Sequence, residues 1–276
     1  KSLSTDVTLF EFSDKASQMT FNLVSDAAWT SNQTVQWFTT TPKSGRGNAT
    51  ITVAAEANNS TEERTGTINY AYVDKTEIVW NLVNRGKKYN YLSRPRRFGK
   101  SLLVDTLQTY FEGRSDLFEG LKIMNLEKEW KKSPVIRLDM SRAGASEKTI
   151  RSYLSMAFSR EEAKYGITMH EGASLADRFD TIIQTACQQT GESVAILIDE
   201  YDSPLQHSWK TPDHEACTAV YREVFAILKA DDEYERFVFI TGITKFTQIS
   251  LFSVLNNLSN ISFDEPFAAI CGITTP

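Results

Sequence analysis

The sequence predicts two domains of different fold class: an antiparallel β-sandwich over residues 1–70 and an α/β domain with a mostly parallel sheet over residues 71–276. Two observations predict this division. Short segments that alternate apolar with polar residues fill the first part, whereas longer apolar strands alternate with amphipathic helices in the second. A chain of 276 residues has the length of one or two domains, and its 41% hydrophobic residues are enough for a sizeable core.

The N-terminal part has the pattern of short antiparallel strands. Turn residues such as the run Pro42–Gly45 separate its alternating segments. Several short strands at this spacing are typical of a β-sandwich. The expected strands cover residues 7–12, 19–24, 34–38, 49–53 and 65–72.

The C-terminal part has longer elements, and their alternation predicts a parallel sheet covered by helices on both faces. The run Val194–Ile198 is fully apolar, as expected for a strand that is buried on both sides. Residues 76–83 are ambiguous, because their apolar residues fit both the alternation of a strand and one face of a helix. The expected strands cover residues 87–92, 133–140, 193–198 and 236–241, and the expected helices cover 100–112, 147–164, 175–190 and 214–230.

Composition excludes several classes of protein. A net charge of −5 argues against a general nucleic-acid-binding surface, although it leaves room for a local basic patch. The three cysteines are odd in number and widely spaced, so they indicate neither a disulfide framework nor a metal motif, and each is expected to be a small buried hydrophobic residue. The sequence shows no signal peptide and no apolar run of membrane-spanning length, which predicts no association with a membrane.

The stretch Ser93–Ser101 predicts a phosphate-binding loop. It lies between an apolar strand and an amphipathic helix, where backbone N–H groups and the positive end of the helix dipole attract anions. In a P-loop, Lys100 would reach the terminal phosphates and the Ser101 hydroxyl would bind Mg²⁺. Only Gly99, Lys100 and Ser101 match the standard pattern, because Arg94 replaces its first glycine. The alternative is a solvated basic turn at the start of a helix.

The basic residues of this loop form a local patch with Arg94. We expect Arg96, Arg97 and Phe98 to bind the nucleotide together with Gly99, Lys100 and Ser101. Arg96 or Arg97, or an arginine from a neighbouring subunit, would offset charge that develops on the phosphate. The alternative is that Arg96 and Arg97 are solvated or paired with acidic residues.

Two further strand ends carry polar residues that complete the predicted site. Asp199 and Glu200 follow an aliphatic strand about a hundred residues after the Gly-Lys-Ser run, which is the pairing of Walker A and Walker B motifs. Asp199 is expected to hold Mg²⁺, and Glu200 is expected to act as the catalytic base that polarises water. Thr241 ends another strand and is the first choice for a γ-phosphate sensor, with Thr244 and Lys245 as alternatives. The alternative for Asp199 and Glu200 is an acidic turn at the end of a strand. The alternative for Thr241 is an ordinary junction of a strand and a turn.

The N-terminal part resembles the BACON domain, an immunoglobulin-like module that is frequent in Bacteroidetes. The resemblance rests on Trp29, Trp37, Pro42–Gly45, Thr50–Val53, Ala57–Ser60 and Glu63–Ile68. It implies carbohydrate as a partner of this module, often in exported proteins. For the two tryptophans we favour packing between sheets over stacking on a sugar, because buried aromatic residues dominate small sandwich cores.

The C-terminal part resembles the AAA-ATPase-like family of bacterial P-loop proteins. The motifs are Tyr72–Thr76, Ser93–Ser101, Leu117–Leu121, Leu197–Pro204, Ile240–Phe246 and Phe252–Leu258. In that family an Arg at the first-glycine position is usual. The resemblance implies ATP and Mg²⁺ as cofactors, Gly99, Lys100 and Ser101 as phosphate and Mg²⁺ ligands, and the roles given above for Asp199 and Glu200. Family members commonly continue into a helical lid and a nuclease-like region, so the chain is expected to be truncated and no nuclease activity is predicted.

The junction creates a conflict, since both domains claim residues 74–84. We expect a helix there and a sandwich without its last strand. The predicted function is ATP binding with Mg²⁺-dependent hydrolysis, carried by a domain with an accessory sandwich. The alternative is an inactive nucleotide-binding or carbohydrate-associated interaction module. An ATPase is expected in the cytoplasm, and nucleic acid as a partner stays open.

Overall fold

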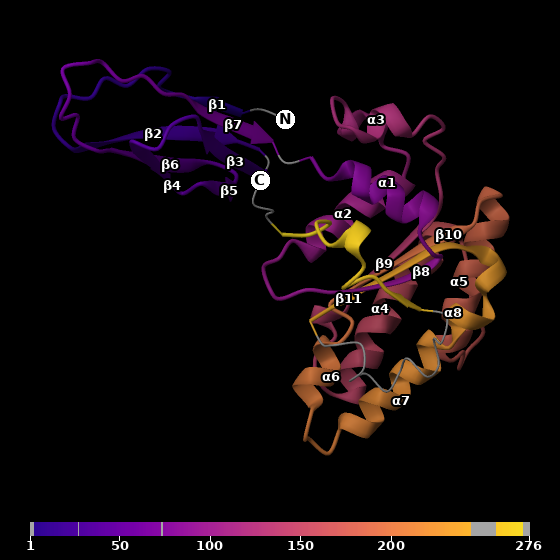
Figure 1. Cartoon of the computed structure of the whole chain (residues 1–276). Coiled ribbons are helices and arrows are strands. Elements are labelled where there is room, and N and C mark those ends of the chain that lie inside the picture. The colour runs from indigo at the N-terminus through magenta and orange to yellow at the C-terminus, as the bar shows by residue number, and fades with distance from the viewer. Residues whose placement is uncertain (1–2, 27, 73, 244–257, 273–276) are drawn as a thin grey trace. The chain divides into compact units, whose positions relative to one another are not determined.

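The computed structural model describes residues 3–26, 28–72, 74–243 and 258–272 (Figure 1). The chain divides into two compact units, with the division between Asp74 and Lys75. In the described part of the chain, no helix is both long enough and apolar enough to cross a membrane.

The N-terminal unit consists of two antiparallel sheets. The first has the strand order β1-β2-β6-β4 and the second has the order β5-β3-β7. The strands are β1 Leu3–Thr5, β2 Ser17–Ser25, β3 Ala28–Gln33, β4 Phe38–Thr41, β5 Ser44–Arg46, β6 Ala49–Ala55 and β7 Ile68–Tyr72.

Two expected strands of this unit are wrong. Residues 7–12 form no strand, because β1 occupies the position beside β2. The side chains of Val7, Phe10 and Phe12 still pack on the core, whereas Leu9 is exposed.

Of the expected strand 34–38, residues 34–37 form the connection between β3 and β4, and only Phe38 belongs to a strand. The Gln33 amide donates hydrogen bonds to the carbonyls of Val35 at 3.0 Å and Phe38 at 2.6 Å. Strand β3 escaped prediction because its polar residues resemble a turn.

Apolar residues from both sheets form one core. Trp29 packs in this core, as expected from the sequence. Its ring is 1% exposed, and its indole N–H donates to the Gly47 carbonyl at 2.9 Å. Gly45 is required beside it, since an added Cβ would lie 2.7 Å from the indole ring. Trp37 is only partly buried, and the Arg64 guanidinium lies 4.8 Å from its ring centroid. One face of Trp37 is therefore covered by a cation.

The C-terminal unit is built on a parallel five-stranded sheet with the order β12-β8-β11-β10-β9. The four longer strands were all predicted to within a few residues. Their bounds are β8 Tyr89–Ser93, β9 Val135–Asp139, β10 Val194–Asp199 and β11 Glu235–Gly242, with β12 at Ser259–Asn260.

Most of the predicted helices are confirmed by the structure. The ambiguous segment 76–83 is helical, so β7 is the last strand before the C-terminal unit. The expected helix over 214–230 is divided at Ala226 into two. The α-helices are α1 Thr76–Arg85, α2 Lys100–Phe111, α3 Ile123–Leu126, α4 Glu147–Tyr165, α5 Leu175–Thr190, α6 Ser203–Ser208, α7 His214–Phe225 and α8 Ile227–Ala230. The 3₁₀ helices are η1 Ser115–Phe118, η2 Met140–Arg142, η3 Asp232–Tyr234 and η6 Glu265–Phe267.

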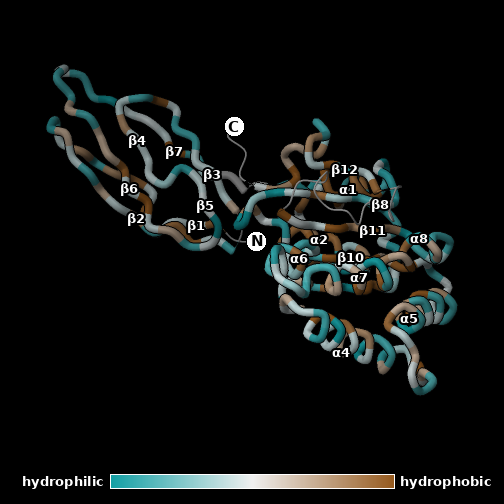
Figure 2. Tube along the Cα trace, turned by 90° about the horizontal axis from the view of Figure 1, so that it is seen from below, coloured by the Kyte–Doolittle hydropathy of each residue, from teal (hydrophilic) through white to brown (hydrophobic). Residues whose placement is uncertain are grey.

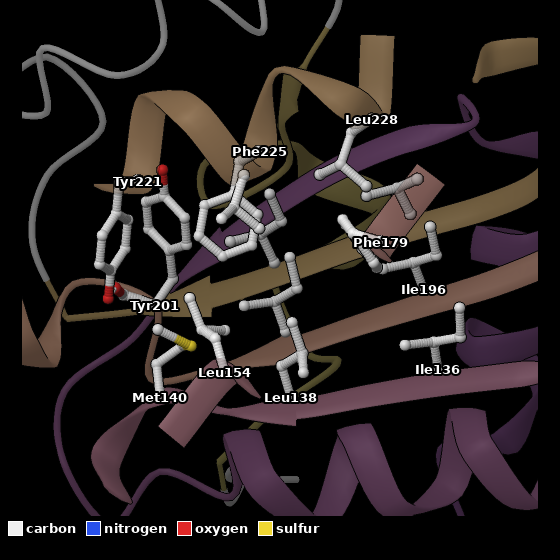
Figure 3. Packing of buried hydrophobic residues seen from close by; sticks show 14 of the residues in the cluster. Ile136, Leu138, Met140, Leu154, Phe179, Ile196, Tyr201, Tyr221, Phe225 and Leu228 are labelled. Atoms are coloured by element: carbon white, nitrogen blue, oxygen red, sulfur yellow. Dashed lines mark hydrogen bonds between the residues drawn. The ribbon is translucent and has the colours of Figure 1, made fainter. Parts of the chain in front are cut away.

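Helices cover both faces of the sheet, because successive side chains of each strand point to opposite faces. Ile196 and Ile198 pack with residues of α4, α5 and α7, whereas Ala195 and Leu197 pack with residues of α1 and α2. Figure 3 shows the first of these two cores. In Figure 2 the central strands are hydrophobic, whereas the helices carry both hydrophobic and hydrophilic residues. The sheet is thus packed against helices on both faces.

A buried acidic cluster lies where β8 and β11 begin. The Tyr89 hydroxyl oxygen lies 2.6 Å from Glu235 Oε2, 2.8 Å from Asp232 Oδ1 and 2.8 Å from the Leu228 carbonyl. One hydroxyl proton serves one acceptor. The hydrogen bond from Tyr89, together with the ion pair to Lys88 at 3.1 Å, lowers the pKa of Asp232. Burial raises the pKa of Glu235 to about 8. A carboxyl with this pKa is mostly protonated at neutral pH, and its Oε2 atom lies within hydrogen-bond distance of the Tyr89 hydroxyl.

Replacing Glu235 with Gln should remove a pH dependence of stability. A carboxyl with a pKa of about 8 in the folded protein and 4.5 when unfolded binds more protons when folded, so its contribution is lost as the pH rises from about 4.5 to about 8. Between pH 5 and pH 8, wild type should lose about 3 to 4 kcal/mol of unfolding free energy relative to Glu235→Gln. Denaturant unfolding at several pH values measures this loss. The exposed Glu119→Gln variant is the control, and a parallel decline in Glu235→Gln and wild type would contradict the assignment.

Candidate functional site

The candidate site lies at the carboxyl edge of the parallel sheet, where four strands end side by side. Strand β8 leads into the loop Ser93–Ser101, and α2 begins at Lys100. Gly99 precedes this helix at φ 86°, in the left-handed region that favours glycine. An added Cβ at Gly99 would contact nothing within 4 Å, so the backbone conformation rather than lack of space requires glycine here. The loop therefore presents the start of a helix at the sheet edge, as the sequence predicts.

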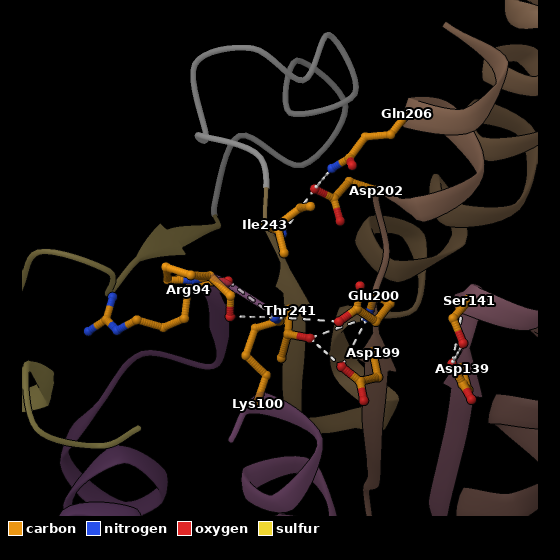
Figure 4. A network of polar contacts seen from close by, with 11 residues as sticks. Arg94, Lys100, Asp139, Ser141, Asp199, Glu200, Asp202, Gln206, Thr241 and Ile243 are labelled. Carbon is orange, nitrogen blue, oxygen red and sulfur yellow. Dashed lines mark hydrogen bonds and ion pairs between the residues drawn. The ribbon is translucent and has the colours of Figure 1, made fainter. Parts of the chain in front are cut away.

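The Lys100 side chain points across this edge toward β10. It is 4% exposed, and its ammonium donates to the carbonyls of Arg94 at 3.1 Å and Pro95 at 3.2 Å (Figure 4). The third partner is Glu200 Oε1, which forms an ion pair with Nζ at 3.4 Å. Three oxygen atoms match the three ammonium protons, which allows the charge to be buried. An anion that binds Lys100 must replace one or more of these partners.

Thr241 connects the acidic strand end to the middle of the sheet. Strand β11 lies between β8 and β10, and the Thr241 hydroxyl donates to Asp199 Oδ1 at 2.5 Å. The Glu200 N–H also points to this pair, at 3.0 Å from Asp199 Oδ1 and 3.3 Å from Thr241 Oγ1. Glu200 has a φ of 50°, a region that is uncommon for a residue with a long side chain. Thr241 is therefore bonded to Asp199, and its hydroxyl is directed there in this structure.

A cavity of about 470 Å³ opens beside these residues. Four of its lining residues were predicted as site residues: Arg96, Ser101, Asp199 and Glu200. Sequence reasoning missed the other lining residues, which are Arg137, Asp139, Ser141, Ser203 and His207.

Asp139 is the missed residue that a sequence signal identifies. It lies near the end of the strand predicted over 133–140 and is the last residue of β9, as Asp199 is of β10. The two residues are paired in register across these strands. The Asp139 carboxylate accepts hydrogen bonds from the N–H and the hydroxyl of Ser141 and lies 3.3 Å from Arg142 Nε. Arg137 similarly pairs with Asp105 at 2.6 Å. Both charges thus have partners within the protein.

The other predicted residues lie around the loop. Arg96, Arg97 and Phe98 are exposed, and Arg97 has a φ of 65°. The Phe98 carbonyl accepts a hydrogen bond from Gly272 at 2.8 Å. Thr244 and Lys245, the alternative sensors, lie outside the described residues.

The site has the donor types that Mg²⁺ and phosphate need. A hydroxyl at Ser101 and a carboxylate at Asp199 line the same cavity and are hard oxygen ligands. Within the described residues, no group of three His, Cys, Asp or Glu side chains is placed to hold a metal by itself. Mg²⁺ is usually held by one or two protein oxygens together with phosphates and water.

A parallel sheet with a Gly-Lys-Ser loop at its carboxyl edge defines the P-loop class of α/β domain. Family comparison agrees, since the model described as "Predicted AAA-ATPase" matches residues 62–252. The chain belongs to this AAA-ATPase-like family. The BACON model, described as "Putative binding domain, N-terminal", matches residues 27–79. The two matches overlap at 62–79, which includes residues 74–79 of the junction that both domains claim.

One curated relative is the "Uncharacterized protein in vnfD 5'region" of Azotobacter chroococcum mcd 1. It is 35% identical over 208 residues, which cover 75% of this chain and 40% of the relative. The chain thus spans less than half the length of this relative.

Similar solved structures include the Aeropyrum pernix ORC2 protein in ADPNP–ADP complexes, with a TM-score of 0.40 and 16% identity over 67% of this chain and 44% of that one. Another is Cdc6p from Pyrobaculum aerophilum, with a TM-score of 0.32 and 13% identity over 70% of this chain and 40% of that one.

Proposed function

We propose that the C-terminal unit binds ATP with Mg²⁺ and hydrolyses it. The observation that carries this proposal is the convergence of Lys100, Asp199, Glu200 and Thr241 at one sheet edge, next to a cavity that Ser101 also lines. A buried ammonium, a carboxylate bonded to a threonine, and a second carboxylate are the groups that phosphoryl transfer uses. Membership of the AAA-ATPase-like family supports the same function.

The contacts of Lys100 indicate what happens when the nucleotide binds. Its ammonium would exchange the carbonyls of Arg94 and Pro95 and the Glu200 carboxylate for phosphate oxygens. Glu200 would then be free to accept a proton from the attacking water. In the protein without nucleotide, the same ion pair keeps this carboxylate occupied. The base would therefore become available only after Lys100 has turned to the phosphates.

Asp199 and Ser101 would hold Mg²⁺, which neutralises negative charge on the phosphates when it is bound. The Thr241 hydroxyl would fix the orientation of the Asp199 carboxylate, because it donates to Oδ1 at 2.5 Å. To act as a γ-phosphate sensor as well, Thr241 would have to turn its single hydroxyl proton from Asp199 to the phosphate. Gly99 and Phe98 would offer backbone N–H groups to the phosphates, and the exposed Arg96 and Arg97 would add positive charge.

We propose that the chain has two domains, at residues 1–70 and 71–276. The first of them would be an immunoglobulin-like accessory module. The BACON match supports a binding role for it. Carbohydrate is the ligand class that we consider for this module. Trp29 is buried and Arg64 covers one face of Trp37, so at most the other face of Trp37 is available to stack on a sugar. We place the protein in the cytoplasm, where ATP is available and where the three free cysteines would stay reduced.

The proposal is tested by measuring ATP binding and phosphate release in the purified chain. Calorimetric titration should give a dissociation constant of about 1 μM to 1 mM with Mg²⁺, the range in which enzymes commonly bind substrates. Phosphate release from ATP should require Mg²⁺ and stop on addition of EDTA. Binding without release would support the inactive nucleotide-binding alternative, and absence of binding to ATP and ADP would refute the proposal.

A further inference from the structure

Arg94, which replaces the first glycine of the P-loop pattern, is bonded to a segment far away in the sequence. Its Nη1 atom donates to the Ser262 carbonyl at 2.7 Å and to the Ser93 carbonyl at 3.0 Å, and Nη2 donates to the Ala268 carbonyl at 3.4 Å. Ser262 and Ala268 belong to residues 258–272, which we call the C-terminal segment. The guanidinium therefore binds protein carbonyls on both sides of the loop entrance.

The loop backbone is bonded to the same segment at two further positions. The Ser93 N–H donates to Ser262 Oγ at 2.8 Å, and the Phe98 carbonyl accepts from the Gly272 N–H at 2.8 Å. Gly272 lies against the Phe98 ring, since an added Cβ would be 3.0 Å from Cδ1. The first half of the loop and its approach to α2 are thus both attached to the C-terminal segment.

The C-terminal segment itself is anchored on the core. Ile261 and Ile270 are 2% and 4% exposed and pack in the core that lies under α1 and α2. The Ile261 N–H donates to the Tyr91 carbonyl at 3.0 Å, and Lys75 Nζ donates to the Gly272 carbonyl at 2.5 Å. A segment held in this way can serve as a rigid support for the loop.

Arg94 differs in this respect from the other loop arginines. Within the described residues, neither Arg96 nor Arg97 donates a side-chain hydrogen bond, and both are exposed. The guanidinium of Arg94 makes three bonds to carbonyls, while its own carbonyl accepts from Lys100 Nζ at 3.1 Å. Arg94 consequently connects the proposed phosphate-binding lysine to the C-terminal segment.

We propose that Arg94 is a positioning residue, which fixes the shape of the phosphate loop by binding it to the C-terminal segment. This inference rests on the proposed nucleotide site. The bulky arginine stands in place of glycine because its side chain points away from the phosphates and ties the loop to the segment. Nucleotide binding and the order of the C-terminal segment are then coupled, and each stabilises the other.

Hydrogen exchange of the full chain without nucleotide tests the first part of the inference. Arg94→Gln should raise exchange about tenfold at the amides of Ser93 and Gly272, since a loss of about 1.4 kcal/mol in local stability corresponds to a factor of ten. Arg94→Lys can keep one of the hydrogen bonds to the carbonyls. Its exchange rate at these two amides should therefore lie between those of Arg94→Gln and wild type. Arg97→Gln is the matched control and should leave both amides protected.

ATP titration tests the second part. Arg94→Gln should lower the affinity for ATP about tenfold. The salt dependence of binding should stay as in wild type, because no contact to phosphate has been removed. In wild type, ATP should slow exchange at Gly272.

Three outcomes separate the possibilities. Weaker ATP binding with unchanged exchange in the nucleotide-free protein would make Arg94 a phosphate ligand and overturn the inference. Unchanged exchange and unchanged binding would overturn it as well. Faster exchange in Arg94→Gln, in a protein whose wild type does not bind ATP, would support the positioning role while refuting the proposed function. If Arg94→Gln does not fold, Ser262→Ala removes only the bond to the Ser93 N–H and should raise exchange at Ser93 by a smaller factor.

Discussion

The Lys100→Ala variant is expected to bind ATP about 10- to 100-fold more weakly than wild type, because it removes a charged hydrogen-bond donor worth about 1.5 to 3 kcal/mol. Lys100 is the buried cation that points to the proposed phosphate position, and its ammonium is already held by the Arg94 and Pro95 carbonyls. The lysine is thus directed before the ligand arrives. Calorimetric titration with ATP and Mg²⁺ measures the loss.

The control for this variant is Lys148→Ala, which removes an exposed lysine near the start of α4. Lys148→Ala should bind ATP as wild type does. Thermal unfolding of both variants shows whether they are folded, and Lys100→Met keeps the length of the side chain if alanine proves too small. Unchanged affinity in a folded Lys100 variant would remove Lys100 from the proposed site.

The Glu200→Gln variant is expected to bind ATP at least as tightly as wild type and to hydrolyse it about 10² to 10⁴ times more slowly. Gln cannot accept a proton from water, which accounts for the slower reaction. The affinity is expected to hold because Glu200 competes with phosphate for Lys100 through the ion pair at 3.4 Å. Removing the negative charge leaves Lys100 available to the ligand. Single-turnover phosphate release, combined with titration, separates the two effects.

Asp139→Asn is the informative comparison for Glu200→Gln. Asp139 lines the same cavity and is paired in register with Asp199, but Ser141 and Arg142 hold its carboxylate. We expect Asp139→Asn to change hydrolysis little. If Asp139→Asn abolishes turnover and Glu200→Gln does not, the catalytic base is Asp139 and our assignment is wrong.

Local sequence patterns predicted much of the C-terminal unit. The apolar run of β10, the helix spacing in α5 and the Gly-Lys-Ser loop are each specified by residues close together in the chain, so periodicity and turn chemistry identify them. The same holds for the two carboxylates at the end of β10. These features depend on few contacts from elsewhere.

Other features could not be predicted because they depend on contacts between distant residues. Strand order is one, since β11 comes after β10 in the chain and yet lies between β8 and β10, which brings Thr241 to Asp199. The bonds of Arg94 to Ser262 are another, because they join residues 168 positions apart. In the N-terminal unit, residues 7–12 have the alternation of a strand but no neighbouring strand to pair with. Alternation alone does not specify a partner.

The left-handed backbone of Glu200 has a consequence for the stability of the protein. At a φ of 50°, a glycine or asparagine would fold with less strain, and a glutamate there costs about 1 kcal/mol or more. Engineering or selection for thermal stability alone would therefore replace Glu200 with a smaller residue. A chain that keeps glutamate at this turn gives up part of its stability margin, which is the trade-off expected where chemistry sets the choice of residue.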